Sequence, residues 1–272
     1  METPIYQVDA FTERVFYGNP AAVCPLEEWL SEDLMQSIAL ENNLPETAFL
    51  VPRGDDYDIR WFTPSMEAEL CGHATLASAH VVFHELRPGL SEVVFHSGKG
   101  PLRVSRLDDG QLALGFPAMP VEQIEPPARL LDGLSIAPEA VYAGMDYVAL
   151  YDTEEEMRAT VPDQGVLIGL DRRAVTVTAP GVGHDFSSRF FAPKQAIYED
   201  AFTGSAHCLL IPFWADRLGK KELTSRQYSR RLGRPHVIEA SCALDGDRVA
   251  IAGHTRSYLS GTISFDPHSA DA

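Results

Sequence analysis

The first quarter of the chain alternates between strand-like and helix-like patterns of apolar residues. Residues 5–11 alternate between apolar and polar side chains, as in a β-strand. Residues 32–41 carry apolar side chains at helical spacing and follow Ser31, a residue type that caps helices. Another strand is predicted at residues 47–51. Residues 72–86 are apolar around most of a helical circumference, which predicts a helix enclosed by sheet.

The rest of the chain predicts many short strands and one more helix. A segment rich in proline and glutamate at residues 117–127 is the candidate linker. An apolar helix is expected at residues 205–218. The expected strands lie at residues 93–95, 102–106 and 112–116, around 140–151, at 166–170 and 175–178, around 237, and at 249–252 and 257–263.

One short motif occurs twice. A strand of the form Arg-aromatic-Phe-X-Pro begins at Arg60 and precedes Gly72-His73, and a second one begins at Arg189 and precedes Gly204-Ser205. Acidic residues and then an apolar helix follow the motif each time, and the segments before it also correspond. The repetition predicts an internal duplication.

The duplication predicts an α+β protein of two pseudo-symmetric, β-barrel-like domains, each wrapped around a central helix. We expect an N-terminal domain at residues 1–118 and a C-terminal domain at 119–272, with the last strand able to return to the N-terminal domain. Two such halves usually meet at a cleft, which is where small-molecule sites tend to lie.

The charge of the chain argues against anionic partners. The sequence has 22 basic and 39 acidic residues, for a net charge of -17, which repels nucleic acids and anionic lipids. The N-terminus lacks the pattern of a signal peptide, and no apolar run approaches the roughly 20 residues of a membrane span. We therefore expect a cytoplasmic protein with no nucleic-acid or membrane partner.

The cysteines and histidines show no spacing typical of a bound metal. The four cysteines are scattered without a CxxC pair, and the histidines form neither HxH nor HExxH. No glycine-rich nucleotide motif is present either. We expect no metal and no cofactor, so that the chemistry would depend on the protein's own side chains.

The two glycine-led helix starts suggest a binding role. Gly72-His73 and Gly204-Ser205 lie where the first helical turn has unpaired amides and the positive end of the helix dipole. Such a terminus can bind a carboxylate or a developing enolate. Glycine and serine also begin many helices that bind nothing, but the matched repetition favours a small anionic metabolite as the ligand.

Several motifs along the chain occur together in a fixed order. They are Asp9-Ala10-Phe11-Thr12, Gly18-Asn19-Pro20-Ala21-Ala22-Val23, Glu46-Thr47-Ala48-Phe49, Leu70-Cys71-Gly72-His73-Ala74-Thr75 and Thr203-Gly204-Ser205-Ala206-His207. Through these motifs the chain resembles the PhzF, or phenazine-biosynthesis-like, family over nearly its whole length. The resemblance implies the diaminopimelate epimerase-like fold, which agrees with the duplication.

The superfamily implies two chemical mechanisms. Racemases and epimerases of this fold use two cysteines, each placed just before the glycine that begins a helix. Cys71 occupies the first place, but Thr203 occupies the second, and its hydroxyl is too weak an acid to replace a thiol. Cys208 lies about one turn too deep in the second helix. The sequence therefore argues against two-thiol racemisation, and Cys71 is expected to be a small buried residue.

The PhzF resemblance implies a proton shift carried by a carboxylate. The family's catalytic glutamate corresponds to Glu46 and its partner aspartate to Asp200. Asp200 is expected to orient a substrate amino or hydroxyl group, or else to cap the loop before the second helix. His73 could donate to a substrate oxygen or relay a proton. The expected substrate-binding residues are Asn19, Gly72, Gly204 and Ser205.

Some residues depart from the family pattern or allow two interpretations. Ala201 stands where a proline commonly follows the aspartate, and Arg231-Leu232-Gly233 stands where Arg-Gly-Gly is usual, which puts the substrate in doubt. Arg60 and Arg189 could clamp a carboxylate or form structural ion pairs. His80, His84 and His207 are expected to be packed or solvated.

The segment at residues 217–234 is rich in arginine and lysine, with only Glu222 opposing them. We interpret it as a solvated face or a subunit contact, and we expect a homodimer.

The leading hypothesis is a cofactor-independent isomerase that moves a proton within a small carboxylate-bearing substrate, with Glu46 as the base. One alternative is an amino-acid-type racemase or epimerase that uses Cys71. The other is a catalytically idle ligand- or protein-binding member of the same fold.

Overall fold

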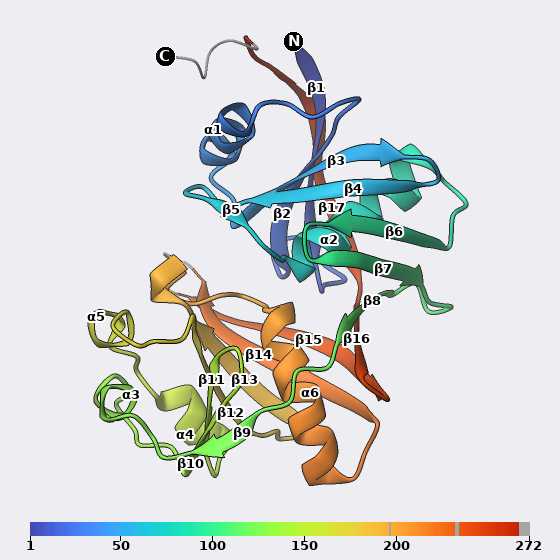
Figure 1. Cartoon of the computed structure of the whole chain (residues 1–272). Helices are drawn as coiled ribbons and strands as arrows, with labels where there is room; N and C mark the ends of the chain where they lie inside the picture. The colour runs from blue at the N-terminus through green and yellow to red at the C-terminus, as the bar shows by residue number, and fades with distance from the viewer. Residues whose placement is uncertain (196, 232–233, 267–272) are drawn as a thin grey trace. The chain divides into compact units, whose positions relative to one another are not determined.

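The structure divides into two units, each built of strands and one long buried helix (Figure 1). It is a computed structural model that describes residues 1–195, 197–231 and 234–266. Unit 1 comprises Met1–Gly115 and Ala252–Ala272, and unit 2 comprises Phe116–Ile251. The last strand therefore belongs to the unit that begins the chain.

In unit 1, the strands surround helix α2, Gly72–Val81. All 10 residues of α2 are buried, and the helix contacts β1, β2, β3, β7 and β17. This confirms the predicted enclosed helix, although its last part, Val82–Leu86, is a π-helical turn. The strands are β1 Glu2–Ala10, β2 Asn19–Pro25, β3 Glu46–Arg53, β4 Asp56–Phe62, β5 Glu67–Ala68, β6 Glu92–Ser97, β7 Gly100–Arg106, β8 Leu112–Pro117 and β17 Thr255–Ser264.

Helix α1, Glu32–Asn42, begins where the sequence predicts it. The Ser31 hydroxyl accepts a hydrogen bond from the Leu34 amide, and two acidic residues in the first turn favour the positive end of the helix dipole. The helix ends at Asn43, whose φ of 48° lies in the left-handed region. These local signals fix both ends of α1.

Unit 2 contains the second long helix, α6, Gly204–Leu218, which ends at Gly219 with a φ of 64°. Its aromatic Trp214 donates a hydrogen bond to the Thr178 hydroxyl at 3.0 Å, which ties α6 to β12. The other elements are β9 Glu122–Ile124, α3 Ala128–Asp132, β10 Ala140–Ala143, β11 Tyr147–Leu150, α4 Glu154–Ala159, α5 Gln164–Leu167, β12 Val175–Pro180, β13 Phe186–Phe191, the 3₁₀ turn Pro193–Gln195, β14 Glu222–Arg231, β15 Arg234–Asp245 and β16 Arg248–Gly253.

The two units repeat the same order of strand pairings. In unit 1, β2 runs parallel to β3, β3 antiparallel to β4, β4 parallel to β6, and β6 antiparallel to β7. In unit 2, the same sequence of orientations joins β11, β12, β13, β14 and β15. Arg60 lies opposite Phe49, and Arg189 lies opposite Val177. The predicted duplication is confirmed.

One prediction of local structure was wrong. Part of the expected strand at residues 166–170 is instead the short helix α5, because the Asp163 carboxylate accepts a hydrogen bond from the Val166 amide and begins a helical turn. The expected linker at residues 117–127 follows directly after the boundary between Gly115 and Phe116, and it contains the short strand β9, which pairs with β10.

Much of the basic segment forms strand β14, and most of its described basic side chains are exposed. Two of its charges have partners distant in sequence: Arg226 pairs with Glu239 at 2.6 Å and Lys220 with Asp185 at 2.5 Å. Leu232 and Gly233 lie outside the described residues, as do the side chains of Arg231 and Arg234.

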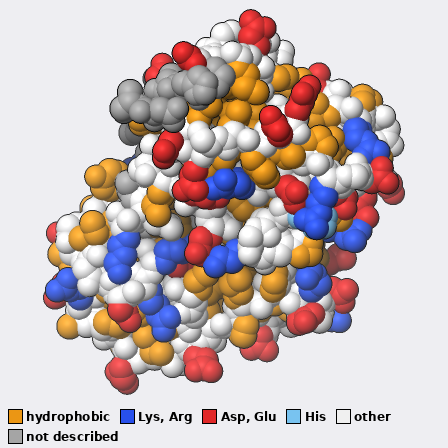
Figure 2. All heavy atoms as spheres, turned by 45° about the horizontal axis from the view of Figure 1, so that its top comes forward, with side chains coloured by type: hydrophobic (Ala, Val, Ile, Leu, Met, Phe, Trp, Pro, Cys, Tyr) orange, Lys and Arg blue, Asp and Glu red, His pale blue; other side chains and the backbone are white. Residues whose placement is uncertain are grey.

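Acidic and basic side chains are intermixed on the surface. On the face shown in Figure 2, the described side chains form no continuous basic area. None of the helices in the described part of the chain is both long and apolar enough to span a membrane.

Two buried histidines form hydrogen bonds to hydroxyl groups. In unit 1, His80 contacts Thr255 at 2.8 Å and Ser257 at 2.7 Å. In unit 2, His207 donates to the Thr203 carbonyl at 2.9 Å and contacts the Ser225 hydroxyl at 3.0 Å. Burial lowers the pKa of His207 to about 4, and burial with nearby positive charges lowers that of His80 to about 3. Both rings are therefore neutral in the folded protein at neutral pH.

These histidines predict that the protein loses stability in mild acid. As the pH falls below 6.5, the ordinary pKa of histidine, these two side chains bind protons in the unfolded chain. In the folded protein they stay neutral until the pH reaches their lowered pKa values. The free energy of unfolding should fall by about 1.4 kcal/mol for each histidine and each pH unit in this range. Urea denaturation between pH 7 and 5 measures it. The His207→Gln variant should show a shallower decline than the wild type, and an identical decline would contradict the assignment.

Candidate active site

The first candidate residue, Glu46, begins strand β3 and is buried, with an exposed fraction of 8%. Its neighbour on the parallel strand β2 is Ala21. Asn19, which is fully buried, begins β2 two positions earlier. The pairing of β2 with β3 therefore places both predicted residues at the same end of this strand pair.

The second group lies at the N-terminus of α2. Cys71 is the N-cap residue, and its side chain makes no capping hydrogen bond. The amide N–H groups of the first turn, beginning with those of Gly72 and His73, point out of the N-terminal end of the helix. The positive end of the helix dipole lies at the same end. The Thr75 hydroxyl donates to the Cys71 carbonyl at 2.6 Å, which fixes this turn.

The structure brings Glu46, His73 and Cys71 together. The His73 Nε2 atom lies 3.1 Å from the Glu46 Oε2 atom, and the Cys71 sulfur lies 3.5 Å from the His73 Nδ1 atom. All three side chains are buried. Despite their proximity, neither Glu46 Oε2 nor His73 Nε2 has a hydrogen bond of acceptable geometry within the described part of the chain. Buried polar atoms in this condition are costly, and they favour a bound ligand that would satisfy them.

The environment sets the protonation of the thiol and the imidazole. Burial, followed by the nearby Glu46 charge, raises the pKa of the Cys71 thiol to about 11, so the thiol is neutral at neutral pH. Burial alone would lower the pKa of His73, but the interactions with Cys71 and Glu46 outweigh it and raise that pKa well above 6.5. Because the thiol is neutral, we attribute the rise at neutral pH mainly to Glu46.

In unit 2, the matching helix start is held by a different set of side chains. Gly204 begins α6, and its N-cap residue Thr203 donates its hydroxyl proton to the Asp200 carboxylate at 2.6 Å. The Ser205 hydroxyl accepts a hydrogen bond from Arg173 at 2.9 Å. Asp200 thus contacts the loop before α6, as its alternative capping role predicts.

Two residues near Ser205 were missed by the sequence analysis. Arg173 donates to both oxygens of the fully buried Asp146, at 3.0 and 2.5 Å, as well as to Ser205. Alignment of the two copies of the repeat would have pointed to Arg173, because this residue precedes β12 much as Glu46 begins β3.

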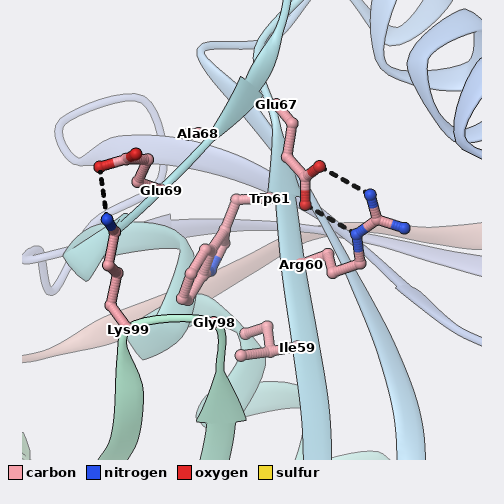
Figure 3. A pocket seen from close by; sticks show the side chains of 8 residues that line it. All are labelled: Ile59, Arg60, Trp61, Glu67, Ala68, Glu69, Gly98 and Lys99. Carbon is pink, nitrogen blue, oxygen red and sulfur yellow. Dashed lines mark hydrogen bonds and ion pairs between the residues drawn. The ribbon is translucent and has the colours of Figure 1, made fainter.

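The repeated arginines form structural ion pairs. Arg60 binds both oxygens of Glu67, at 2.7 and 2.6 Å, and Arg189 pairs with Glu199 at 2.7 Å. Figure 3 shows the first pair beside a surface pocket in which Lys99 also pairs with Glu69. This pocket is lined by none of the predicted site residues. Of the two interpretations left open for these arginines, the geometry supports the ion pair.

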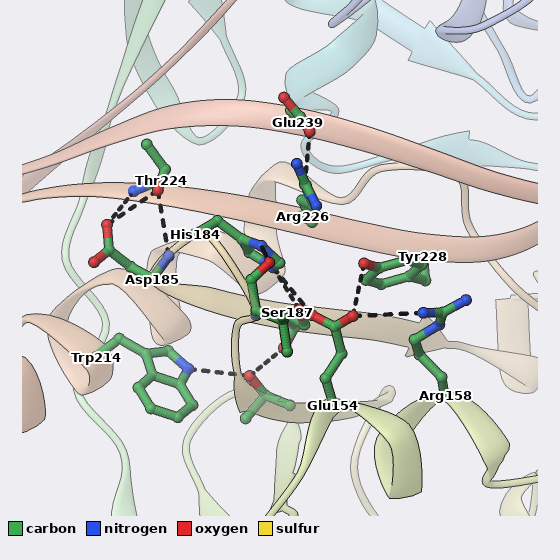
Figure 4. A network of polar contacts seen from close by, with 12 residues as sticks. Glu154, Arg158, His184, Asp185, Ser187, Trp214, Thr224, Arg226, Tyr228 and Glu239 are labelled. Carbon is green, nitrogen blue, oxygen red and sulfur yellow. Dashed lines mark hydrogen bonds and ion pairs between the residues drawn. The ribbon is translucent and has the colours of Figure 1, made fainter.

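A second polar cluster, around Glu154, contains serine, histidine and an acid (Figure 4). The Glu154 carboxylate accepts hydrogen bonds from Ser187 at 2.6 Å and Tyr228 at 2.9 Å. The His184 Nε2 atom faces both Ser187 and Glu154, while its Nδ1 atom donates to the Val182 carbonyl. A hydrolase triad instead needs the acid and the serine on opposite ring nitrogens. Because Ser187 is also fully buried, we assign this cluster a structural role.

The remaining predicted histidines behave as expected. His80 and His207 are buried and hydrogen-bonded, and His84 is exposed and stacks on His80 with ring centres 4.2 Å apart. They are packed or solvated, as predicted.

Comparison with known proteins identifies the family. The model of the phenazine biosynthesis-like (PhzC-PhzF) family matches residues 8–261. The chain belongs to this family. An uncharacterized isomerase of Pseudomonas aeruginosa is 47% identical over 263 residues, which cover 97% of this chain and 99% of that protein.

Solved structures agree with the family assignment. A PhzF-family phenazine biosynthesis protein from Enterococcus faecalis has 41% identity and a TM-score of 0.91, with coverage of 97% of this chain and 100% of that one. A probable proline racemase from Agrobacterium radiobacter has 13% identity and a TM-score of 0.60, over 98% of this chain and 94% of that one, which shows a shared fold alone. The predicted epimerase-like fold is confirmed.

Within this PhzF-family chain, one set of residues could hold a metal ion. Glu46, Cys71 and His73 each offer one ligand atom, and these three atoms lie within 4.8 Å of one another. The sequence analysis expected no metal site because it looked for paired cysteines or histidines. The Cys71-X-His73 spacing was the available signal, and Glu46 joins it only through the fold.

The burial of the cysteines predicts unreactive thiols. All four are free and buried, and burial raises the pKa of Cys71 to about 11 and that of each other thiol to about 12. Because the thiolate is the reactive form, the folded protein at pH 8 should react with Ellman's reagent at least about 100-fold more slowly than free cysteine. Unfolding in guanidinium should release four thiols. A fast-reacting thiol in the folded protein would show that a cysteine is accessible and activated.

Proposed function

We propose that this protein is a cofactor-independent isomerase that shifts a proton within a small carboxylate-bearing substrate. The observation that carries the proposal is the buried pair of Glu46 Oε2 and His73 Nε2, which lie 3.1 Å apart with no good hydrogen bond to satisfy either atom in the described residues. A substrate beside them would supply well-oriented hydrogen-bond partners. The isomerase named among the similar proteins supports the same reaction class.

Glu46 would act as the base and then as the acid. Its carboxylate would remove a proton from a carbon next to an electron-withdrawing group and return it to another carbon of the same substrate. The charge that develops on the substrate would be stabilised by the first-turn amides of α2, which no side chain caps. His73, charged at neutral pH by its proximity to Glu46, would donate to a substrate oxygen and keep the substrate oriented.

The residues of unit 2 keep their predicted roles in this proposal. Asp200 would orient a substrate group, while the first-turn amides of α6 and Ser205 would bind an anionic group. Asn19 would contact the substrate from β2. A homodimer and a cytoplasmic location also remain expectations.

The alternative that uses Cys71 as a racemase acid or base has less support. Its thiol is neutral at neutral pH, and the matching place before α6 holds Thr203, whose hydroxyl is engaged with Asp200 at 2.6 Å. A catalytically idle binding protein would have the same fold, and only a turnover measurement separates it from an isomerase.

The proposal predicts exchange of carbon-bound hydrogen with solvent that depends on Glu46. Incubating the protein in heavy water with a panel of small unsaturated and amino-substituted carboxylates should incorporate deuterium into at least one of them, as measured by mass spectrometry. The Glu46→Gln variant should lower the rate by roughly 10²- to 10⁴-fold, because the amide cannot accept the proton.

The matched control is Glu69→Gln, which changes an acid whose side chain is 80% exposed and should leave exchange unchanged. Undiminished incorporation by Glu46→Gln would reject Glu46 as the base. If Cys71→Ala abolished exchange while Glu46→Gln kept it, the racemase alternative would be favoured.

A further inference from the structure

Three chemically different ligands meet at the start of α2. They are the Glu46 carboxylate, the Cys71 thiol and the His73 imidazole. Each offers one ligand atom, these three atoms lie within 4.8 Å of one another, and all three residues are buried. Thiolate, imidazole and carboxylate are the ligand types that zinc takes in proteins. Surface acids often cluster without binding a metal, whereas this group lies inside unit 1.

The hydrogen bonding of the group also points to a ligand. Glu46 Oε2 and His73 Nε2 form an ion pair at 3.1 Å, but neither atom makes a hydrogen bond of good geometry among the described residues. Two ligands at about 2.1 Å from a tetrahedral zinc ion are roughly 3.4 Å apart, so these atoms are already close to the required spacing. The sulfur now contacts the other ring nitrogen at 3.5 Å, so the Cys71 side chain would have to rotate to bring the sulfur to the same ion.

The charges of the group can be balanced by a divalent ion. Binding would displace the proton of the Cys71 thiol and one proton of the His73 imidazolium to solvent, which leaves one thiolate, one carboxylate and one neutral imidazole around the ion. The positive end of α2 disfavours a cation, but it also stabilises the thiolate at its first turn. Two negative ligands then neutralise the charge of the ion.

We propose that Glu46, Cys71 and His73 bind one thiophilic divalent cation such as Zn²⁺, and that this ion inhibits the protein. The fourth coordination position would be open to water or a substrate oxygen. A bound ion occupies the lone pairs that the proposed reaction needs on Glu46, so it blocks proton transfer. The binding of the ion does not depend on the proposed function, whereas its inhibitory effect rests on that function.

Titration of the purified full-length protein with zinc chloride, after treatment with a chelator, tests the site. Isothermal titration calorimetry at pH 7 should give one zinc ion per chain, with about two protons released, one from the thiol and one from the imidazolium, as judged from the heats in buffers of different ionisation enthalpy. Cys71→Ala should weaken binding by at least about tenfold. The matched control is Cys208→Ala, another buried thiol, which bonds the Gly204 carbonyl at 3.4 Å and should bind zinc like the wild type.

Cobalt gives a spectroscopic signature of the sulfur ligand. Replacement of zinc by Co²⁺ should produce a sulfur-to-cobalt charge-transfer band in the near ultraviolet, which Cys71→Ser should lack. Circular dichroism checks that each variant is folded, and the serine variant conserves the side-chain size if the alanine variant is unstable. Equal zinc affinity in the wild type and a folded Cys71 variant, or no binding by the wild type, overturns the proposal.

The deuterium-exchange assay separates this proposal from the proposed function. Exchange by the zinc-free protein that zinc does not inhibit would reject only the inhibitory site. Stoichiometric zinc binding through Cys71 by a protein that exchanges no substrate would support the site and count against the isomerase.

Discussion

The proposed chemistry of this protein depends on one buried contact, between the carboxylate of Glu46 and the imidazole of His73 at 3.1 Å. An isolated charge in an apolar interior is strongly unfavourable, so a buried acid and a buried histidine are tolerated when each supports the other. Burial alone would lower the pKa of His73, but its interactions with Cys71 and with Glu46 together raise it. Both atoms still lack a well-formed hydrogen bond within the described chain, which leaves them available to a third group.

The fold creates this contact through its backbone. The parallel pairing of β2 with β3 fixes the start of β3, where Glu46 lies, and the enclosure of α2 by strands fixes the first turn that contains His73. The helix can be buried on all sides because most of its residues are small or apolar. The same pattern of pairings in unit 2 holds the start of α6, where a salt bridge between Arg173 and Asp146 replaces the acid and the imidazole. One duplicated scaffold thus carries two helix starts with different chemistry.

Much of the fold and part of the site could be predicted from the sequence. Capping residues, apolar helices and the repeated arginine motif predicted α1, α2, α6 and the duplication, because these signals are local or self-similar. The strand expected at residues 166–170 failed because one aspartate cap outweighed a short apolar run. The Glu46, Cys71 and His73 group needs β3 and α2 to pack together, and the partners of Arg173 likewise come from distant segments. Sequence spacing alone contains no such information.

The most direct test of the account is a titration of the His73 ring by nitrogen-15 NMR in the zinc-free wild type and in Glu46→Gln. If the carboxylate holds the imidazolium, the ring of the wild type should remain protonated well above pH 6.5, and its pKa should fall in the variant. An exposed-acid control, Glu69→Gln, should titrate like the wild type. The same His73 pKa in wild type and Glu46→Gln would show that the two groups are not coupled, which would contradict the central claim.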